Sequence, residues 1–236
     1  MIIEILYPEI ANLNGDLENP RYLARSCGAS LISCTLGSVP AFVNEDVSLV
    51  YLGSTTERGQ ILIRDALSPY ADALRKRTER GGITLVTGNA LELFGSYIED
   101  DNGIRHEMLE WFPTHARQDL YHRYNAFGLG SFDEMQIVGF MSRFSHSYGK
   151  NEHPLFRMVR GAGMNPDESG EGFRMKNFMA TYLLGPLMIL NPLFAKYTLG
   201  LMGISEPKLA FEEAAVDAYY ARLAWFSDSG RDCLYK

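Results

Sequence analysis

The sequence has few cysteines and no surplus of basic residues. Its three cysteines, Cys27, Cys34 and Cys233, have the spacing of neither a metal site nor a redox motif. An odd number of cysteines without a secretory signal favours inert thiols in the reducing cytoplasm. With 22 Lys and Arg against 29 Asp and Glu, the net charge of −7 argues against nucleic-acid binding, which needs clustered positive charge.

The sequence also lacks an unbroken apolar run long enough to span a membrane. Its most apolar segment, residues 178–203, is interrupted by Pro186, Asn191, Pro192 and Lys196, whereas a spanning helix needs about 20 predominantly apolar residues. A Gly-rich loop followed by Lys and Ser or Thr, the motif that holds nucleotide phosphates, is missing as well. We therefore expect no membrane insertion, and we expect any ATP chemistry to belong to another chain.

The first half of the sequence alternates short apolar runs with helical patterns. Buried strands are predicted at residues 2–7, 29–35, 47–52 and 83–87, and helices at 17–27, 59–80 and 90–97. Strands that alternate with helices of this length are typical of a parallel sheet covered on both faces. We therefore predict a single α/β domain over residues 1–236, with a doubly wound, mostly parallel sheet flanked by helices.

The second half has a different pattern. Residues 100–165 are rich in Gly, His and aromatic residues, and predict antiparallel strands and surface loops. The predicted elements of this half are short β-like runs at 136–140 and 155–159, a strand at 177–183, a helix after Pro192 and a last helix from about 207 to 226. The aromatic face of that last helix either packs in the core or docks another subunit. This face consists of Tyr219, Tyr220, Leu223, Trp225 and Phe226.

Five segments, in order along the chain, carry a family resemblance. They are LYPEIANLNGDLEN (6–19), VYLGSTTERGQ (50–60), VTGNALELFG (86–95), IVGFMSRFSHSYG (137–149) and GAGMNPDESGEGFRMKNFMATYLLGPLMILNP (161–192). They resemble an opening strand and turn, a strand with its oxyanion loop, a nucleophile elbow, a Gly-Phe-Glu-Asn-His segment and a Thr-Tyr-Leu-x-Gly-Pro core. These are features of class I, triad-type glutamine amidotransferases of the cobyric acid synthase group, and most closely of the glutaminase subunit of lipid II isoglutaminyl synthase. The resemblance implies a flavodoxin-like three-layer fold with its site at the carboxyl ends of the strands.

The resemblance places the catalytic cysteine of the family at Gly88 and its catalytic histidine at Leu184. Hydrolysis of an amide needs a nucleophile and a base that activates it. Glycine can form no covalent intermediate, and leucine can take no proton. Glycine also adopts the strained elbow conformation freely, at a position that costs other residues about 1–3 kcal/mol.

The loop that corresponds to the oxyanion loop differs from the family as well. Where the family has three glycines, this chain has Gly53, Ser54 and Thr55, whose side chains crowd a place that a substrate must approach closely. We expect these side chains and Leu184 to fill the space beside the elbow. Gln60 keeps its family identity, which suggests that the scaffold of the loop remains.

Three more residues are candidates for the region of the site. Asn89 follows the nucleophile position, and Glu92 stands where the family has Gln and is expected to orient the elbow helix. In the segment that resembles Gly-Phe-Glu-Asn-His, the family's histidine becomes Arg143 or slips to His146. A polar loop histidine is the simpler interpretation of His146.

No metal and no cofactor are predicted. His106, His115 and His122 are spaced nine and seven residues apart, which matches no standard structural zinc pattern. Residues 165–171 are acidic but lack the alternating ligands of a calcium loop, so we interpret them as a surface turn.

These changes together predict a catalytically disarmed amidotransferase subunit that binds or regulates a partner enzyme. The resemblance implies an ATP-dependent, ligase-like partner in a peptidoglycan lipid II or cobyrinate context, and a glutamine-like small molecule as the ligand if one is bound. The alternative is an active amidotransferase or hydrolase with a changed substrate or a relocated nucleophile, for which Thr87 and Ser96 are the candidates.

Overall fold

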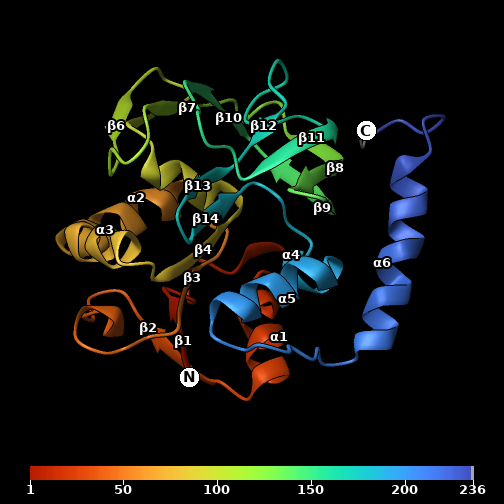
Figure 1. Cartoon of the computed structure of the whole chain (residues 1–236). Coiled ribbons are helices and arrows are strands. Elements are labelled where there is room, and N and C mark those ends of the chain that lie inside the picture. Colours follow the sequence, from red (N-terminus) through yellow and green to blue (C-terminus); the bar gives the residue numbers. More distant parts are fainter. Residues whose placement is uncertain (235–236) are drawn as a thin grey trace.

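A six-stranded sheet forms the centre of the computed structural model, which describes residues 1–234 (Figure 1). In spatial order its strands are β2 (Ser30–Cys34), β1 (Ile2–Leu6), β3 (Leu49–Leu52), β4 (Ile83–Thr87), β14 (Phe178–Thr181) and β13 (Phe173–Met175). Neighbouring strands are parallel except for β13 and β14. The order of the five parallel strands is that of a flavodoxin-like, doubly wound sheet. The predicted fold class is therefore confirmed.

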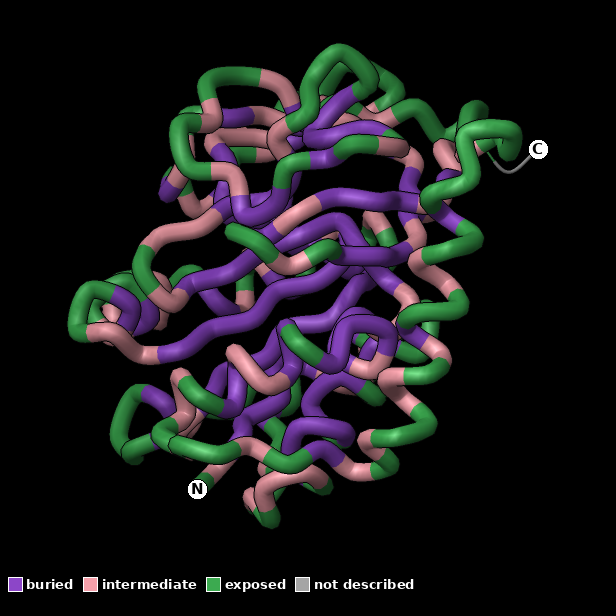
Figure 2. The backbone as a smooth tube through the Cα atoms, turned by 45° about the vertical axis from the view of Figure 1, so that its right-hand side comes forward, coloured by how far each residue is buried: buried purple, intermediate pink, exposed green. Residues whose placement is uncertain are grey.

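Helices cover both faces of this sheet, since the strand side chains alternate between two apolar clusters. One layer contains α1 (Glu18–Cys27), α4 (Leu187–Leu190) and α5 (Pro192–Leu201), and the other contains α2 (Glu57–Leu67), α3 (Ala71–Glu79) and the 3₁₀ helix η4 (Gly88–Phe94). Ile3 and Ile5 pack in the cluster of the first layer, while Val50 and Leu52 pack in that of the second. Figure 2 shows the central strands as buried tubes between partly exposed layers.

Two further four-stranded sheets lie above the central sheet in the view of Figure 1. One contains β5 (Tyr97–Glu99), β6 (Arg105–Glu107), β7 (Thr114–Gln118) and β10 (Ser145–Gly149); the other contains β8 (Tyr124–Phe132), β9 (Met135–Arg143), β11 (Phe156–Arg160) and β12 (Gly170–Glu171). All their pairs are antiparallel except β5 with β7. The prediction of antiparallel strands in this region is confirmed.

The outer edge of β9 is closed by main chain and by one side chain rather than by another strand. Leu184 and Phe140 exchange both backbone hydrogen bonds, at 2.7 and 3.1 Å. The side chain of Asn191 accepts from the N–H of Val138 and donates to its carbonyl, both at 2.8 Å. The backbone groups that an edge strand would otherwise leave open are thus paired at two residues.

Three predicted helices were wrong in their extent. The predicted helix 59–80 is broken by a 3₁₀ turn at Ser68–Tyr70, because Pro69 lacks the backbone N–H that an α-helix requires. The predicted helix 90–97 is η4, which ends at Phe94, because the carbonyl of Phe94 accepts from two residues of the following segment instead of continuing a helix. The last helix, α6, spans Glu212–Ser227 and thus begins later than predicted.

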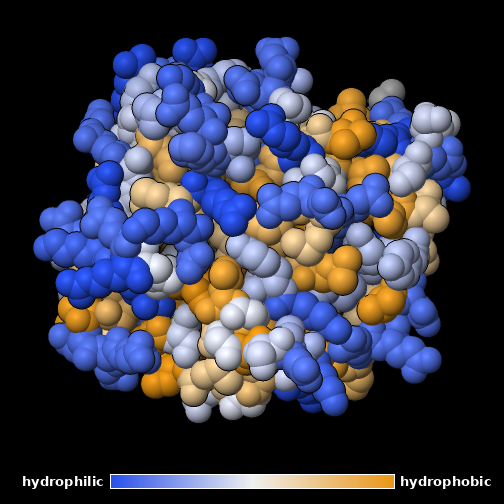
Figure 3. Space-filling view, viewed as in Figure 1, coloured by the Kyte–Doolittle hydropathy of each residue, from blue (hydrophilic) through white to orange (hydrophobic). Residues whose placement is uncertain are grey.

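Helix α6 stands at the right of Figure 1 and contacts β8 and β9. Tyr219 and Phe226 are buried in a small cluster with Leu129, Val138 and Leu190, whereas other aromatic residues of the helix remain exposed. On the face shown in Figure 3, apolar side chains form groups interspersed with hydrophilic ones. Over residues 1–234, no helix combines the length and the apolar character needed to cross a bilayer.

Candidate functional site

Gly88 directly follows the buried strand β4 and begins η4, so the chain makes the strand–turn–helix arrangement of a nucleophile elbow. Its φ of +66° lies in the left-handed region, which glycine adopts without the steric cost that a Cβ would bring. The residue is buried at the carboxyl end of the strand, where open parallel sheets carry their sites.

The structure brings Gly88, Ser54 and Leu184 together from three distant parts of the chain. A Cβ placed on Gly88 would lie 2.3 Å from the Cβ of Ser54 and 3.2 Å from Cδ2 of Leu184. Real Cβ atoms essentially never come within 3.0 Å of a heavy atom outside their own and the adjacent residues, so the space beside the elbow is occupied. Ser54 fills it more completely than Leu184 does.

In the loop of Gly53, Ser54 and Thr55, two backbone N–H groups donate to side chains from other parts of the chain. The N–H of Ser54 donates to Oδ2 of Asp16 at 2.7 Å, and the N–H of Thr55 donates to Oδ1 of Asn89 at 3.0 Å. An oxyanion hole works through backbone N–H groups that are free to point at the developing charge. These two donors already have acceptors.

A polar cluster that the sequence did not identify lies beneath this loop. Asp16 accepts the hydroxyl of Thr87 at 2.8 Å through the same oxygen that accepts the N–H of Ser54. Asn19 donates to the Tyr51 hydroxyl at 3.1 Å, and that hydroxyl lies 2.7 Å from Oγ1 of Thr87. Burial raises the pKa of Asp16 to about 6, while the hydrogen bonds from Ser54 and Thr87 oppose this shift. Asp16 lies in the turn of the first family-like segment (residues 6–19), where the sequence reads Asn12-Leu13-Asn14-Gly15-Asp16, and this turn was its only sequence signal.

A second polar cluster fixes η4 against α2 and the upper strands. Gln60 donates to the carbonyl of Asn89 and to Oε2 of Glu92, both at 2.8 Å. Glu92 also accepts the hydroxyl of Tyr182 at 2.8 Å and that of Ser145. Burial raises the pKa of Glu92, and its hydrogen-bond donors oppose that rise. Glu92 thus lies where a residue that orients the elbow helix would lie.

A polar pocket of about 240 Å³ opens beside the loop. It is lined by Leu13, Asn14, Ser54, Thr55, Thr56, Glu57, Asn89, Arg123, Ser142, Arg143 and Phe144. Arg143 is only 3% exposed and stacks over the ring of Tyr182 at 3.8 Å. Its Nη2 donates to the carbonyl of Gly163 at 2.9 Å, but its buried Nε and Nη1 have no hydrogen-bond partner. A buried guanidinium with unused donors is costly unless an acceptor is supplied.

Two candidates lie apart from this arrangement. His146 is on β10 between Ser145 and Ser147, whose hydroxyls contact Glu92 and Tyr182, so strand alternation directs His146 to the opposite face. There its ring meets that of a tyrosine, and burial lowers its pKa to about 4. The prediction that Ser96 lies at the end of a helix was wrong. Ser96 directly precedes β5, and its N–H donates to the carbonyl of Thr114.

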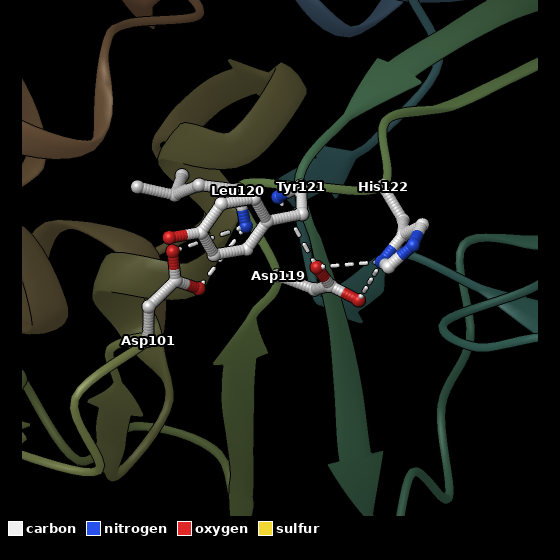
Figure 4. A network of polar contacts seen from close by, with 5 residues as sticks. All are labelled: Asp101, Asp119, Leu120, Tyr121 and His122. Carbon is white, nitrogen blue, oxygen red and sulfur yellow. Dashed lines mark hydrogen bonds and ion pairs between the residues drawn. The ribbon is translucent and has the colours of Figure 1, made fainter.

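The three histidines considered for zinc have separate surroundings. His106 lies 3.2 Å from Asp100, and His115 stacks on a tyrosine. Figure 4 shows His122 directed toward the carboxylate of Asp119, at 2.8 Å. Among the described residues, no three His, Cys, Asp or Glu side chains come together as a metal ion would require.

Comparison with known proteins gives consistent matches over most of the chain. The CobB/CobQ-like glutamine amidotransferase domain matches residues 3–189. The chain is 24% identical over 197 residues to the GatD subunit of the glutamine-hydrolyzing lipid II isoglutaminyl synthase of Streptococcus pneumoniae (strain ATCC BAA-255 / R6), covering 79% of this chain and 74% of that protein. For the GatD subunit of Staphylococcus aureus (strain N315), identity is 28% over 190 residues, covering 74% and 73%.

A solved structure supports the same assignment at the level of the fold. A crystal structure of glutamine amidotransferase matches with a TM-score of 0.59 and 14% identity, covering 86% of this chain and all of that one. At this identity the likeness concerns the fold alone. Because the family domain covers residues 3–189, this chain belongs to the CobB/CobQ-like glutamine amidotransferase domain family.

Proposed function

We propose that this chain is a catalytically disarmed amidotransferase subunit that binds and regulates a partner enzyme. The observation that carries the proposal is the packing at Gly88, where even a Cβ would lie 2.3 Å from that of Ser54. A cysteine needs still more room, so its thiolate has no place there. Leu184 cannot act as a base, and the N–H groups of Ser54 and Thr55 already have acceptors.

The partner we propose is an ATP-dependent, ligase-like enzyme of the cytoplasm. The two curated relatives are named as subunits of a synthase, which supports a function within a complex. Those names favour lipid II amidation in peptidoglycan synthesis over a cobyrinate-type reaction. The three cysteines of the chain are unpaired, in agreement with a reducing compartment.

We further propose that the polar pocket beside the loop holds the carboxylate of a glutamine-like molecule. A carboxylate offers the paired acceptors that a guanidinium prefers, and Arg143 has two buried donors without a partner. Arg123 adds a second positive charge to the pocket wall. Glutamine should therefore bind without being hydrolysed, and Arg123→Gln should weaken that binding about tenfold, as measured by titration calorimetry. Unchanged affinity in this variant would argue against the pocket as the binding site.

The principal test is glutamate release from glutamine by the purified chain, alone and with its co-expressed partner. The native chain should release none above background. The triple variant Ser54→Gly, Gly88→Cys, Leu184→His restores nucleophile, base and space, and should exceed the background rate by roughly 100-fold or more. The matched control is the double variant Gly88→Cys, Leu184→His, which retains the overlap with Ser54 and should be less stable and less active.

The alternative, a relocated nucleophile, makes a distinct prediction. Thr87 is fully buried and its hydroxyl is bonded to Asp16, so no substrate carbonyl can reach it in this conformation. Glutamate release by the native chain would reject the proposal of a disarmed subunit. Covalent labelling of Thr87 or Ser96 by a glutamine-analogue electrophile, found by peptide mass spectrometry, would identify the replacement.

A further inference from the structure

A cavity of about 490 Å³ lies between α1 and α6 and shares no lining residue with the polar pocket beside Gly88. Its remaining walls come from Ile189, which belongs to α4, and from Ala210 and Phe211, which precede α6. Helix α6 follows the region matched by the family domain, which ends at residue 189. The cavity therefore depends on a part of the chain outside that domain. Its volume is within the range typical of sites for small molecules.

Each of the two helices presents one face to the cavity. The lining residues of α1 are Glu18, Arg21, Tyr22 and Arg25, and those at the start of and along α6 are Phe211, Ala214, Ala215, Ala218 and Arg222. Both sets follow the spacing of three and four residues that places side chains on one helical face. The small alanine side chains of α6 leave the space open, and they make its floor apolar.

The edge of the cavity is positively charged, although the chain as a whole is acidic. Arg21 is paired with Glu18 at 2.8 Å. Among the described residues, Arg25 and Arg222 form no ion pair within 4.0 Å, and Arg25 lies over the ring of Phe211 at 5.3 Å. Two guanidinium groups thus remain available at the mouth of an apolar cavity.

A buried polar group in the wall also lacks a partner. Tyr22 is 7% exposed, and its hydroxyl has no hydrogen-bond partner. Burial raises the pKa of this hydroxyl, with the charge of Glu212 adding to the effect, so the hydroxyl stays protonated and can donate. Glu212 itself is satisfied by Lys196 and by the N–H of Leu209. A buried tyrosine hydroxyl normally has a partner; the oxygen of Tyr22 is closed off from solvent, so a ligand in the cavity would supply a partner once the side chains around the hydroxyl move.

We infer that this cavity binds a small amphipathic anion, which has an apolar body and a carboxylate or phosphate head. The apolar body would lie against the alanine face of α6, where it is removed from water. The head would meet the guanidinium groups of Arg25 and Arg222, which bind carboxylate and phosphate oxygens through charge-assisted hydrogen bonds. This site is separate from the polar pocket beside Gly88, so its test does not depend on the proposed function.

Titration calorimetry of the full chain with octanoate, octyl phosphate and neutral octyl glucoside, all below their micelle concentrations, tests the inference. At least one of the two anions should bind saturably, and the tighter of the two identifies the preferred head group. The variant Arg25→Gln, Arg222→Gln should weaken anion binding about tenfold or more and leave octyl glucoside unchanged. Equal affinity for the anions and the neutral compound, or no saturable binding of either anion, would overturn the inference.

Two further variants locate the binding. Ala218→Trp should fill the cavity and abolish binding of the anions, whereas Ala224→Trp, at an exposed residue of the same helix that is turned about 120° away from Ala218 and does not line the cavity, should retain it. Circular dichroism and thermal unfolding establish that both variants are folded. Tyr22→Phe, which removes only the unpartnered hydroxyl, should weaken binding about threefold to tenfold. Anion binding that persists in a folded Ala218→Trp chain would place the site elsewhere and reject the assignment.

Discussion

Ser54 has two different surroundings, one on the side of its backbone and one on the side of its Cβ. Its N–H is held by Asp16, whose other partners form a buried and hydrogen-bonded polar cluster. Its Cβ occupies the space next to Gly88 into which a side chain at that position would extend. The polar groups that fix the loop are therefore paired, while the space beside Gly88 is packed. The comparison separates two features of one residue, the hydrogen bonds that hold the loop and the packing that fills the space beside the elbow.

The largest change in stability should come from removing the hydrogen bonds that hold the backbone of Ser54. Asp16→Ala would leave the N–H of Ser54 and the hydroxyl of Thr87 without their buried acceptor. We expect a loss of about 3–5 kcal/mol in the free energy of unfolding, measured with urea at pH 7. Asp16→Asn keeps an acceptor oxygen and should lose clearly less. Equal losses in the two variants would mean that the carboxyl group itself, and not the acceptor oxygen that asparagine also offers, matters at this position.

The same cluster should make the protein less stable as the pH rises. Burial raises the pKa of Asp16 from 3.8 to about 6, so between these values the folded protein holds a proton that the unfolded chain has lost. The unfolding free energy should fall by roughly 3 kcal/mol from about pH 4 to pH 6 for this group. Glu171, whose pKa burial raises to about 7, should extend the fall toward neutral pH.

Urea unfolding at a series of pH values measures this dependence. Asp16→Asn should flatten the profile between about pH 4 and pH 6, and Glu171→Gln should flatten it between about pH 4.5 and pH 7. A native stability that rises through this window would contradict the assignment of raised pKa values to these two carboxyl groups.

Of these three changes in stability, the smallest should come from adding a side chain to Gly88, next to the Cβ of Ser54. Gly88→Ala introduces a Cβ at a φ of +66° and against Ser54, and should destabilise the protein by about 2 kcal/mol. Ser54→Gly in the same chain should recover about half of that loss by removing the overlap, while the backbone cost remains. Additive effects of the two substitutions, measured by a double-mutant cycle in urea, would show that Ser54 does not occupy the space beside the elbow.

The parts of the fold that local patterns determine were predictable. Continuous apolar runs identified β1, β3 and β4, because strands buried on both faces have little else in them. The break of the predicted helix 59–80 at Pro69 could also have been predicted, since proline cannot continue an α-helix. The helix prediction overlooked this residue. The short 3₁₀ form of η4 could not be predicted from the local sequence. The helix ends because its last carbonyl groups accept hydrogen bonds from the backbone of residues 109–112, more than ten positions away.

The family resemblance allowed the proximity of Gly88 and Leu184 to be predicted, whereas the contacts between other distant segments could not be predicted. Gly88 and Leu184 were located by aligned motifs, and the structure places them side by side. The overlap at Ser54, the cluster around Asp16 and the unpartnered donors of Arg143 arise from segments far apart in the sequence. No local pattern encodes such distances. The face to which His146 points depends in the same way on the register of β10 with its neighbour.

The closure of the β9 edge has a consequence for association between chains. An unpaired edge of this length is a template on which a second chain can add a strand and begin aggregation. Leu184 and Asn191 prevent this at Phe140 and Val138, but in different ways. Leu184 protects the edge through its backbone N–H and carbonyl, which every residue except proline has, so a change of side chain at this position leaves the protection intact. Asn191 protects through its amide group, and a change there would open the edge to self-association.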